Sequence, residues 1–177
     1  MNIFYKTSIM FLAAASLTAC ANDAPPQIHT ASLINNERTI IGHVTLMETP
    51  NGIEAEIEID GLTSGKHGMH FHKVGDCSDS AFKNSGGHIN PDSKQHGLLS
   101  AHGPDNADLP NLVVDAQGGV IQTVTNDRLS FDGKDKRPAL FDADGSALVI
   151  HASADDQISQ PIGGAGARVA CAVIKRD

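Results

Sequence analysis

The segment Ile53-Glu54-Ala55-Glu56-Ile57-Glu58-Ile59-Asp60 alternates apolar and acidic residues without a break. Side chains of a β-strand point alternately to its two faces, so this pattern predicts a strand with one buried and one solvated face. Residues 39–47, just before it, are rich in β-branched and apolar side chains, and Thr49-Pro50-Asn51-Gly52 supplies turn residues between the two segments. We therefore expect an antiparallel β-hairpin here.

The rest of the chain also reads as short strands, with no 3.6-residue period of useful length. The further predicted strands are residues 69–72, 112–114, 120–125, 147–151 and 168–174. Of these, 112–114 and 120–125 flank Gln117-Gly118-Gly119, which predicts a second hairpin.

The segments between the predicted strands are unequal in length. Residues 73–111, 126–146 and 152–167 are long and rich in Gly, Pro and Asp. Long loops on an all-β scaffold usually carry function. The prediction is an all-β fold: an antiparallel Greek-key β-sandwich or flattened β-barrel with long functional loops.

The composition of the 177-residue chain narrows the class of protein. Hydrophobic residues make up 40% and charged residues 19%, which suits one packed domain and argues against global disorder. The net charge is −8, aromatic residues are 4% and Trp is absent, so no nucleic-acid partner is expected. The chain holds 9 His beside 13 Lys and Arg, and neutral imidazoles in an acidic background favour metal binding.

The N-terminus reads as an export signal. Lys6 precedes the short apolar run 9–15, and Leu17-Thr18-Ala19-Cys20 resembles the lipobox of bacterial lipoproteins, in which the Cys is lipidated. An ordinary signal cleavage after Ala21 is the alternative. We expect a signal peptide over residues 1–19, a lipidated Cys20 with a tether to residue 36, and a domain over 37–177.

The remaining cysteines are Cys77 and Cys171. Two cysteines in an exported domain are expected to pair, and the alternative is two free buried thiols.

The histidines sort by spacing. His70 and His72 are two apart on a predicted strand, so their imidazoles share one face, although that pattern alone more often marks two surface histidines. His88 lies in a loop rich in Gly and Pro, and His151 ends an apolar strand. Together with His96 and His102, which follow His88, these positions indicate a metal site.

Several runs of residues, in the same order along the chain, resemble one family. Gly68-Met69-His70-Phe71-His72-Lys73-Val74-Gly75-Asp76-Cys77 is similar to the copper-binding strand of the Cu/Zn superoxide dismutases. Gly87-His88-Ile89-Asn90-Pro91 resembles their metal-bridging loop, and Leu148-Val149-Ile150-His151 resembles the strand with the last copper ligand. Gly163-Gly164-Ala165-Gly166-Ala167-Arg168-Val169-Ala170-Cys171 resembles their C-terminal motif. The resemblance spans about residues 39–175.

The resemblance implies a role for each matching residue. The implied copper ligands are His70, His72, His88 and His151. His88 would also bridge to zinc as an imidazolate. Asp155 would link a copper histidine to a zinc histidine, Arg168 would attract superoxide beside the copper, and His67 would be structural rather than a ligand. Cys77 and Cys171 would form the family disulfide.

The implied zinc site departs from the family pattern of three His and one Asp. With His88 and His96 as the first two ligands, the third position falls on Asp105 and the carboxylate on Asp108. Asp is a competent zinc ligand, so a site of two His and two Asp is expected. The alternatives are His102 as a ligand, if the loop folds differently, or weak or absent zinc.

The activity implied by the resemblance is the dismutation of superoxide to O2 and H2O2 by a cycling copper. The alternatives are a copper-buffering lipoprotein, a copper-only dismutase and a structural cell-envelope β-sandwich. The expected location is the periplasm or cell envelope, with membrane contact only through a lipid on Cys20, the outer membrane favoured, and a homodimer possible. Three basic residues of the 126–146 loop, Lys134, Lys136 and Arg137, either steer the substrate or form a solvated loop face.

Overall fold

The computed structural model describes residues 25–176, so the predicted signal peptide and Cys20 lie outside the described part. Within that part the strands are β1 (Ile28–Asn35), β2 (Ile40–Thr49), β3 (Gly52–Asp60), β4 (Gly65–His67), β5 (Met69–His72), β6 (Leu112–Val114), β7 (Gly119–Asn126), β8 (Ser146–His151) and β9 (Arg168–Ile174), with one 3-10 turn, η1 (Lys83–Ser85). No helix of residues 25–176 is long and apolar enough to cross a membrane.

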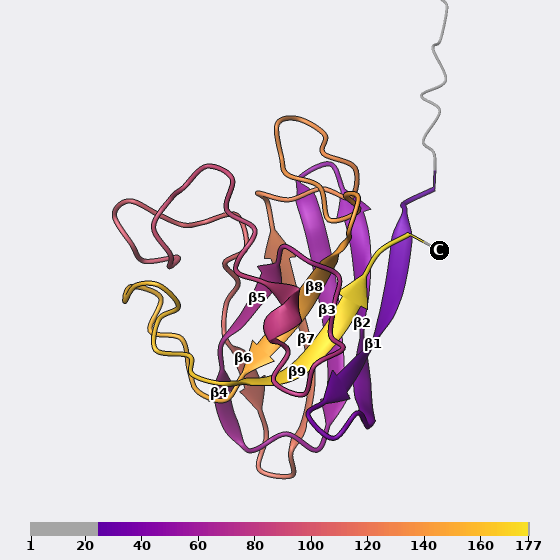
Figure 1. Cartoon of the computed structure of the whole chain (residues 1–177), viewed down its shortest axis with the longest axis vertical. Helices are drawn as coiled ribbons and strands as arrows, with labels where there is room; N and C mark the ends of the chain where they lie inside the picture. Colours follow the sequence, from indigo (N-terminus) through magenta and orange to yellow (C-terminus); the bar gives the residue numbers. More distant parts are fainter. Residues whose placement is uncertain (1–24, 177) are drawn as a thin grey trace, which may run out of the picture.

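The strands form one seven-stranded sheet in the order β5-β8-β9-β1-β2-β3-β7 and a small sheet of β4 and β6. Every strand pairing in both sheets is antiparallel. The large sheet curls around the core, as Figure 1 shows. The predicted all-β antiparallel fold is therefore confirmed.

The alternating segment lies in β3 and behaves as its pattern predicts. Ile53, Ala55, Ile57 and Ile59 are buried, whereas the acidic residues between them are exposed or half-buried. β3 pairs with β2 through the Thr49–Gly52 turn, so the first predicted hairpin is confirmed. The buried isoleucines belong to the main hydrophobic core, which also contains side chains from loops 73–111 and 126–146.

Two expectations about the strands are wrong. The segment proposed as a tether, residues 20–36, contains β1, which pairs with β2 along most of its length. Its buried Leu33 packs in the main core, so the folded part of the chain begins by residue 28. The second predicted hairpin is also wrong: β6 and β7 do not pair with each other. Instead, β6 pairs with β4 and β7 pairs with β3. The turn and a hydrogen bond from the Val113 amide to the Gln122 side chain link β6 to β7.

The long loops lie in two separate places around the sheet. Loops 73–111 and 152–167 lie on one side in Figure 1, where the Leu99 amide donates to the Gln157 carbonyl at 3.1 Å. Loop 126–146 lies elsewhere, near the β2–β3 turn: Lys134 pairs with Glu48 at 3.0 Å, and Arg137 contacts the Pro50 carbonyl at 3.4 Å. Lys134 and Arg137 thus contact the β2–β3 hairpin.

The free edge of β5 brings loop 73–111 to the centre of the molecule. β5 pairs with β8 on one side. On the other side its residues form isolated bridges with the loop, His70 with Asp108 and His72 with His88. These backbone contacts place loop residues that are distant in sequence beside the histidines of the strand.

Candidate metal centre

A first group of ligand atoms comes from paired strands. His70 and His72 lie on β5, and His151 is the last residue of β8, its partner strand. One nitrogen from each of the three rings lies within 4.8 Å of the others, and all three residues are buried. The two-residue spacing and the strand pairing therefore converge on one point.

Each of these rings is held by one nitrogen and leaves the other without a hydrogen bond. His72 Nδ1 donates to the Gly86 carbonyl at 2.9 Å, and His151 Nδ1 donates to the Gly166 carbonyl at 3.0 Å. His70 Nε2 donates to Asp155 Oδ2 at 2.7 Å. The opposite nitrogens are buried and have no hydrogen-bond partner among the described residues. Buried polar atoms are rarely left unpaired, so these nitrogens fit a metal ion.

The protonation of these rings also suits a metal. Burial lowers the pKa of His70 to about 3, of His72 to about 2 and of His151 to about 4. All three are neutral at pH 7, so each offers a lone pair without first losing a proton.

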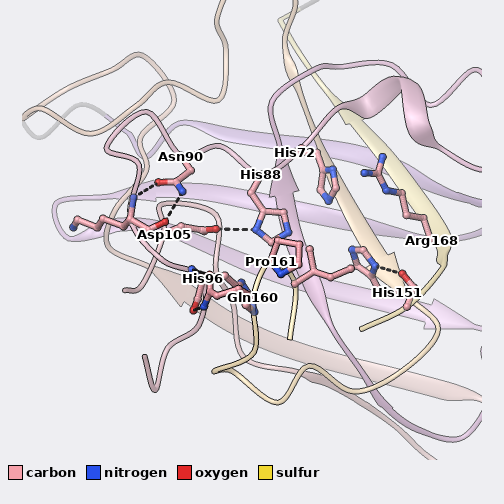
Figure 2. A pocket seen from close by; sticks show the side chains of 13 residues that line it. His72, His88, Asn90, His96, Asp105, His151, Gln160, Pro161 and Arg168 are labelled. Carbon is pink, nitrogen blue, oxygen red and sulfur yellow. Dashed lines mark hydrogen bonds and ion pairs between the residues drawn. The ribbon is translucent and has the colours of Figure 1, made fainter. Parts of the chain in front are cut away.

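His88 stands between this group and a second one. Its Nε2 is buried without a hydrogen-bond partner among residues 25–176, and its ring centroid lies 4.2 Å from that of His70 and 5.3 Å from that of His72. Figure 2 shows the rings of His72, His88 and His151 turned toward one another. On the opposite edge, His88 Nδ1 lies 2.8 Å from Asp105 Oδ2.

The second group consists of His88, His96, Asp105 and Asp108, whose ligand atoms also lie within 4.8 Å of one another. His96 Nδ1 and Asp108 Oδ1 are 2.6 Å apart, yet the geometry is not that of a hydrogen bond. This mixed nitrogen and oxygen donor set fits zinc, with two histidines and two carboxylates. His102 is exposed and lies outside the group.

Asp155 joins the two groups. Its Oδ2 accepts from His70 Nε2 at 2.7 Å, and its Oδ1 accepts from His96 Nε2 at 3.0 Å. The carboxylate is completely buried. Burial by itself raises the pKa of Asp155, but the hydrogen bonds from His70 and His96 outweigh this effect and hold that pKa well below its usual range. Burial also opposes the charged form of His96, but the carboxylates of Asp108 and Asp155 raise its pKa to about 10.

Comparison with known proteins identifies the family of the chain. The family described as copper/zinc superoxide dismutase (SODC) matches residues 40–174. The chain belongs to the copper/zinc superoxide dismutase family.

Relatives and solved structures agree with this membership. A superoxide dismutase [Cu-Zn] of Caulobacter vibrioides is 47% identical over 135 residues, covering 76% of this chain and 78% of the relative. One from Aquifex aeolicus is 40% identical over 82% of this chain and 85% of its own length. The crystal structure of a SOD-like protein from Bacillus subtilis matches with a TM-score of 0.78 at 32% identity, covering 82% of this chain and 97% of that one. Copper and zinc are the metals of this family.

Arg168 begins β9 at the edge of the dismutase-like site. Its Nη2 donates to the Gly86 carbonyl at 2.7 Å, and its Nη1 donates to Ser85 Oγ at 3.0 Å and to the Phe82 carbonyl at 2.5 Å. The guanidinium and the imidazoles line one open cavity of about 350 Å³, in which Arg168 lies beside His72 (Figure 2). Burial lowers the pKa of Arg168 from its ordinary value.

The disulfide joins Cys77 in loop 73–111 to Cys171 on β9, with Cα atoms 6.0 Å apart. The predicted pairing is confirmed. A buried disulfide fits a protein of an oxidising compartment.

His67 lies outside both ligand groups. Its Nδ1 faces the His151 carbonyl at 2.7 Å, and its Nε2 faces the Thr63 carbonyl at 2.8 Å. Both ring nitrogens are thus engaged with the backbone, which leaves neither for a metal.

Sequence reasoning missed two amide side chains that hold the backbone of Asp155 and of His96. Asn111 accepts from the Asp155 amide and donates to the Asp155 carbonyl, both at 2.8 Å. Gln160 accepts from the His96 amide at 2.9 Å and donates to the His96 carbonyl at 2.8 Å. These contacts join residues of different loops and bind backbone atoms, so no spacing in the sequence signals them.

Proposed function

We propose that this protein dismutates superoxide at a copper ion bound by His70, His72, His88 and His151, with zinc bound by His88, His96, Asp105 and Asp108. The observation that carries the proposal is the placement of His88. Its Nδ1 is 2.8 Å from Asp105 Oδ2 in one ligand group, and its buried Nε2 is directed to the other. One imidazole with ligands on both sides is what a bridged pair of metals requires.

The bound copper supplies one-electron redox chemistry, by which one superoxide is oxidised to O2 and a second is reduced, with two protons, to H2O2. The residues of this chain supply the rest. Arg168, held by its three hydrogen bonds at the cavity, attracts the anionic substrate. His88 Nε2 is the atom placed to hold a proton for the reduction, because its Nδ1 is engaged on the zinc side. Asp155 orients His70 and His96 together.

The proposal extends to the location of the protein. The Leu17–Cys20 motif supports export and lipidation at Cys20, which would hold the domain at a cell-envelope membrane, the outer one favoured. A Cys20→Ser variant should then move from the membrane fraction to the soluble fraction of the periplasm while keeping its activity. A wild-type protein found only in the soluble fraction would contradict the anchor and leave the catalytic proposal standing.

Purified protein should contain stoichiometric copper and zinc and consume superoxide. The His88→Ala variant should lose zinc and most of the activity, because both ligand groups share that ring. Stoichiometric copper without turnover in the wild type would instead favour copper buffering, and a chain with no tight copper would favour a structural role.

A further inference from the structure

The turn formed by residues 105–108 carries both carboxylates of the proposed zinc site, and its backbone is held from outside the metal centre. Arg128 lies two residues beyond the end of β7. Its Nε donates to the Asp105 carbonyl at 3.0 Å, and its Nη2 donates to the Asp108 carbonyl at 2.6 Å. One planar guanidinium therefore contacts the first and the last residue of the turn.

The end of β7 reinforces this contact. The buried Asn126 donates to the Asn106 carbonyl at 2.9 Å and to the Asp108 carbonyl at 3.3 Å. Its side-chain oxygen accepts from the Arg128 amide at 2.8 Å, which fixes the chain where the guanidinium begins. β7 thus ends in donors directed at the backbone of the turn.

Within the turn, each carboxylate uses one oxygen for the backbone and leaves the other for the metal side. Asp108 Oδ2 accepts from the Asp105 amide at 2.9 Å and from the Gly97 amide at 2.7 Å. Asp105 Oδ1 accepts from the Ala107 amide at 2.9 Å. The remaining oxygens lie against His88 and His96. The direction of both ligand oxygens consequently depends on the backbone of residues 105–108.

The charge of Arg128 is partly offset, because its Nη1 pairs with the exposed Asp127 at 2.8 Å. The geometry of the Arg128 guanidinium is therefore the property on which its contact with the turn depends. An aspartate has a short, two-torsion side chain, so it cannot compensate for a displaced backbone as a longer ligand can. A lysine in place of Arg128 could donate to one carbonyl as a point charge, but it lacks the rigid fork that reaches two.

We infer that Arg128 is a positioning residue of the zinc centre, whose guanidinium fork sets the separation of Asp105 and Asp108 and so aims both carboxylates at the metal. The inference rests on the proposed zinc ligands. It assigns to loop 126–146, which contributes none of the proposed ligands, an indirect part in zinc binding.

The test compares Arg128→Gln and Arg128→Lys with Arg137→Gln in the disulfide-bonded protein. Arg137 is a matched control, since it belongs to the same loop and its guanidinium donates to the Pro50 carbonyl, away from the turn. Zn²⁺ affinity is measured by competition with a chelator, and the visible spectrum of Co²⁺ bound in place of zinc reports the geometry of the site. Both Arg128 variants should bind Zn²⁺ about ten- to a hundredfold more weakly and alter the Co²⁺ bands, because outer residues of metal sites have effects of that size. Arg137→Gln should match the wild type.

The outcomes separate the inference from the proposal beneath it. A wild type that binds no Zn²⁺ overturns the ligand set and the inference with it. A wild type that binds Zn²⁺, with Arg128→Gln within twofold of it, overturns the inference alone. Full recovery of affinity and spectrum by Arg128→Lys would show that charge suffices and would also overturn it. Copper affinity and far-ultraviolet circular dichroism should stay unchanged in each variant, which excludes loss of the fold as the cause.

Discussion

The imidazole of His88 and the carboxylate of Asp105 lie 2.8 Å apart, Nδ1 to Oδ2, with both side chains largely buried. In the proposed zinc site, Asp105 takes the position where the family pattern has a histidine. Its two carboxylates would give that site one more negative charge than the usual set, which would favour a dication. The extra charge would also weaken the local attraction for an anionic substrate, so the proposal leaves more of that attraction to Arg168.

Asp105→Ala should weaken Zn²⁺ binding at least about tenfold and leave copper binding nearly unchanged, because the carboxylate belongs to the zinc group alone. Zinc content after dialysis against a chelator measures the effect. His102→Ala is the control, since that ring is exposed and should not affect zinc. Equal zinc retention in Asp105→Ala and the wild type would remove Asp105 from the ligand set.

Arg168→Ala should slow superoxide consumption while copper content stays the same, because the guanidinium lines the cavity without belonging to a ligand group. Superoxide dismutases are themselves an established example of electrostatic steering, in which attraction raises encounter rates about ten- to a thousandfold. We expect a loss of about tenfold and a weaker dependence on ionic strength. Arg176→Ala removes the same charge at the exposed pair with Asp132 and should have little effect. Equal losses in the two variants would contradict a specific role for Arg168.

The metal-free protein should become less stable as the pH falls from about 6.5 toward 4. Burial lowers the pKa of His70, His72 and His151 in the folded state, so the unfolded chain binds more protons in this range. Each histidine then contributes a slope of up to about 1.4 kcal/mol per pH unit to the free energy of unfolding. His96 adds no slope there, because its raised pKa leaves it protonated in both states below pH 6.5. Its stabilising effect is lost instead as the pH rises toward 10.

Urea unfolding of chelator-treated protein at several pH values between 4 and 6.5 measures this dependence. A His72→Asn variant has one fewer buried imidazole and should show a shallower slope. A free energy of unfolding that does not change with pH in this range would show that the three rings are not buried as neutral groups.

Cys77→Ser combined with Cys171→Ser should lower the free energy of unfolding by about 2–5 kcal/mol, since the bond closes a long loop in the unfolded chain. Thermal or urea unfolding of the oxidised wild type and the double variant gives the difference. The loop around Cys77 leads to η1, whose Ser85 contacts Arg168, so the double variant should also lose part of its superoxide consumption. Unchanged stability and unchanged activity together would show that packing alone holds this loop.

Much of the fold could be predicted because it is encoded locally. The alternation in residues 53–60 identifies the buried face of β3, and the observed β9 has the same limits as the segment predicted from its apolar run. β1 escaped prediction because half of its residues are polar, and only Ala31 and Leu33 are buried. The partner of β6 escaped it because a turn signal between two strands does not establish that those strands pair.

The sequence by itself determined the class of fold, the shared face of His70 and His72, and the metal chemistry of the histidines, because strand periodicity and side-chain type are local properties. The family resemblance pointed to Asp105 and Asp108 but left His102 open, and only the tertiary structure decided between them. It brought Asp105 to His88 and left His102 exposed, and it placed Arg128 and Gln160 on the backbone of residues of the second group. The physical reason is that these contacts run between loops and end on carbonyl and amide groups, which every residue carries and which therefore leave no mark in the sequence.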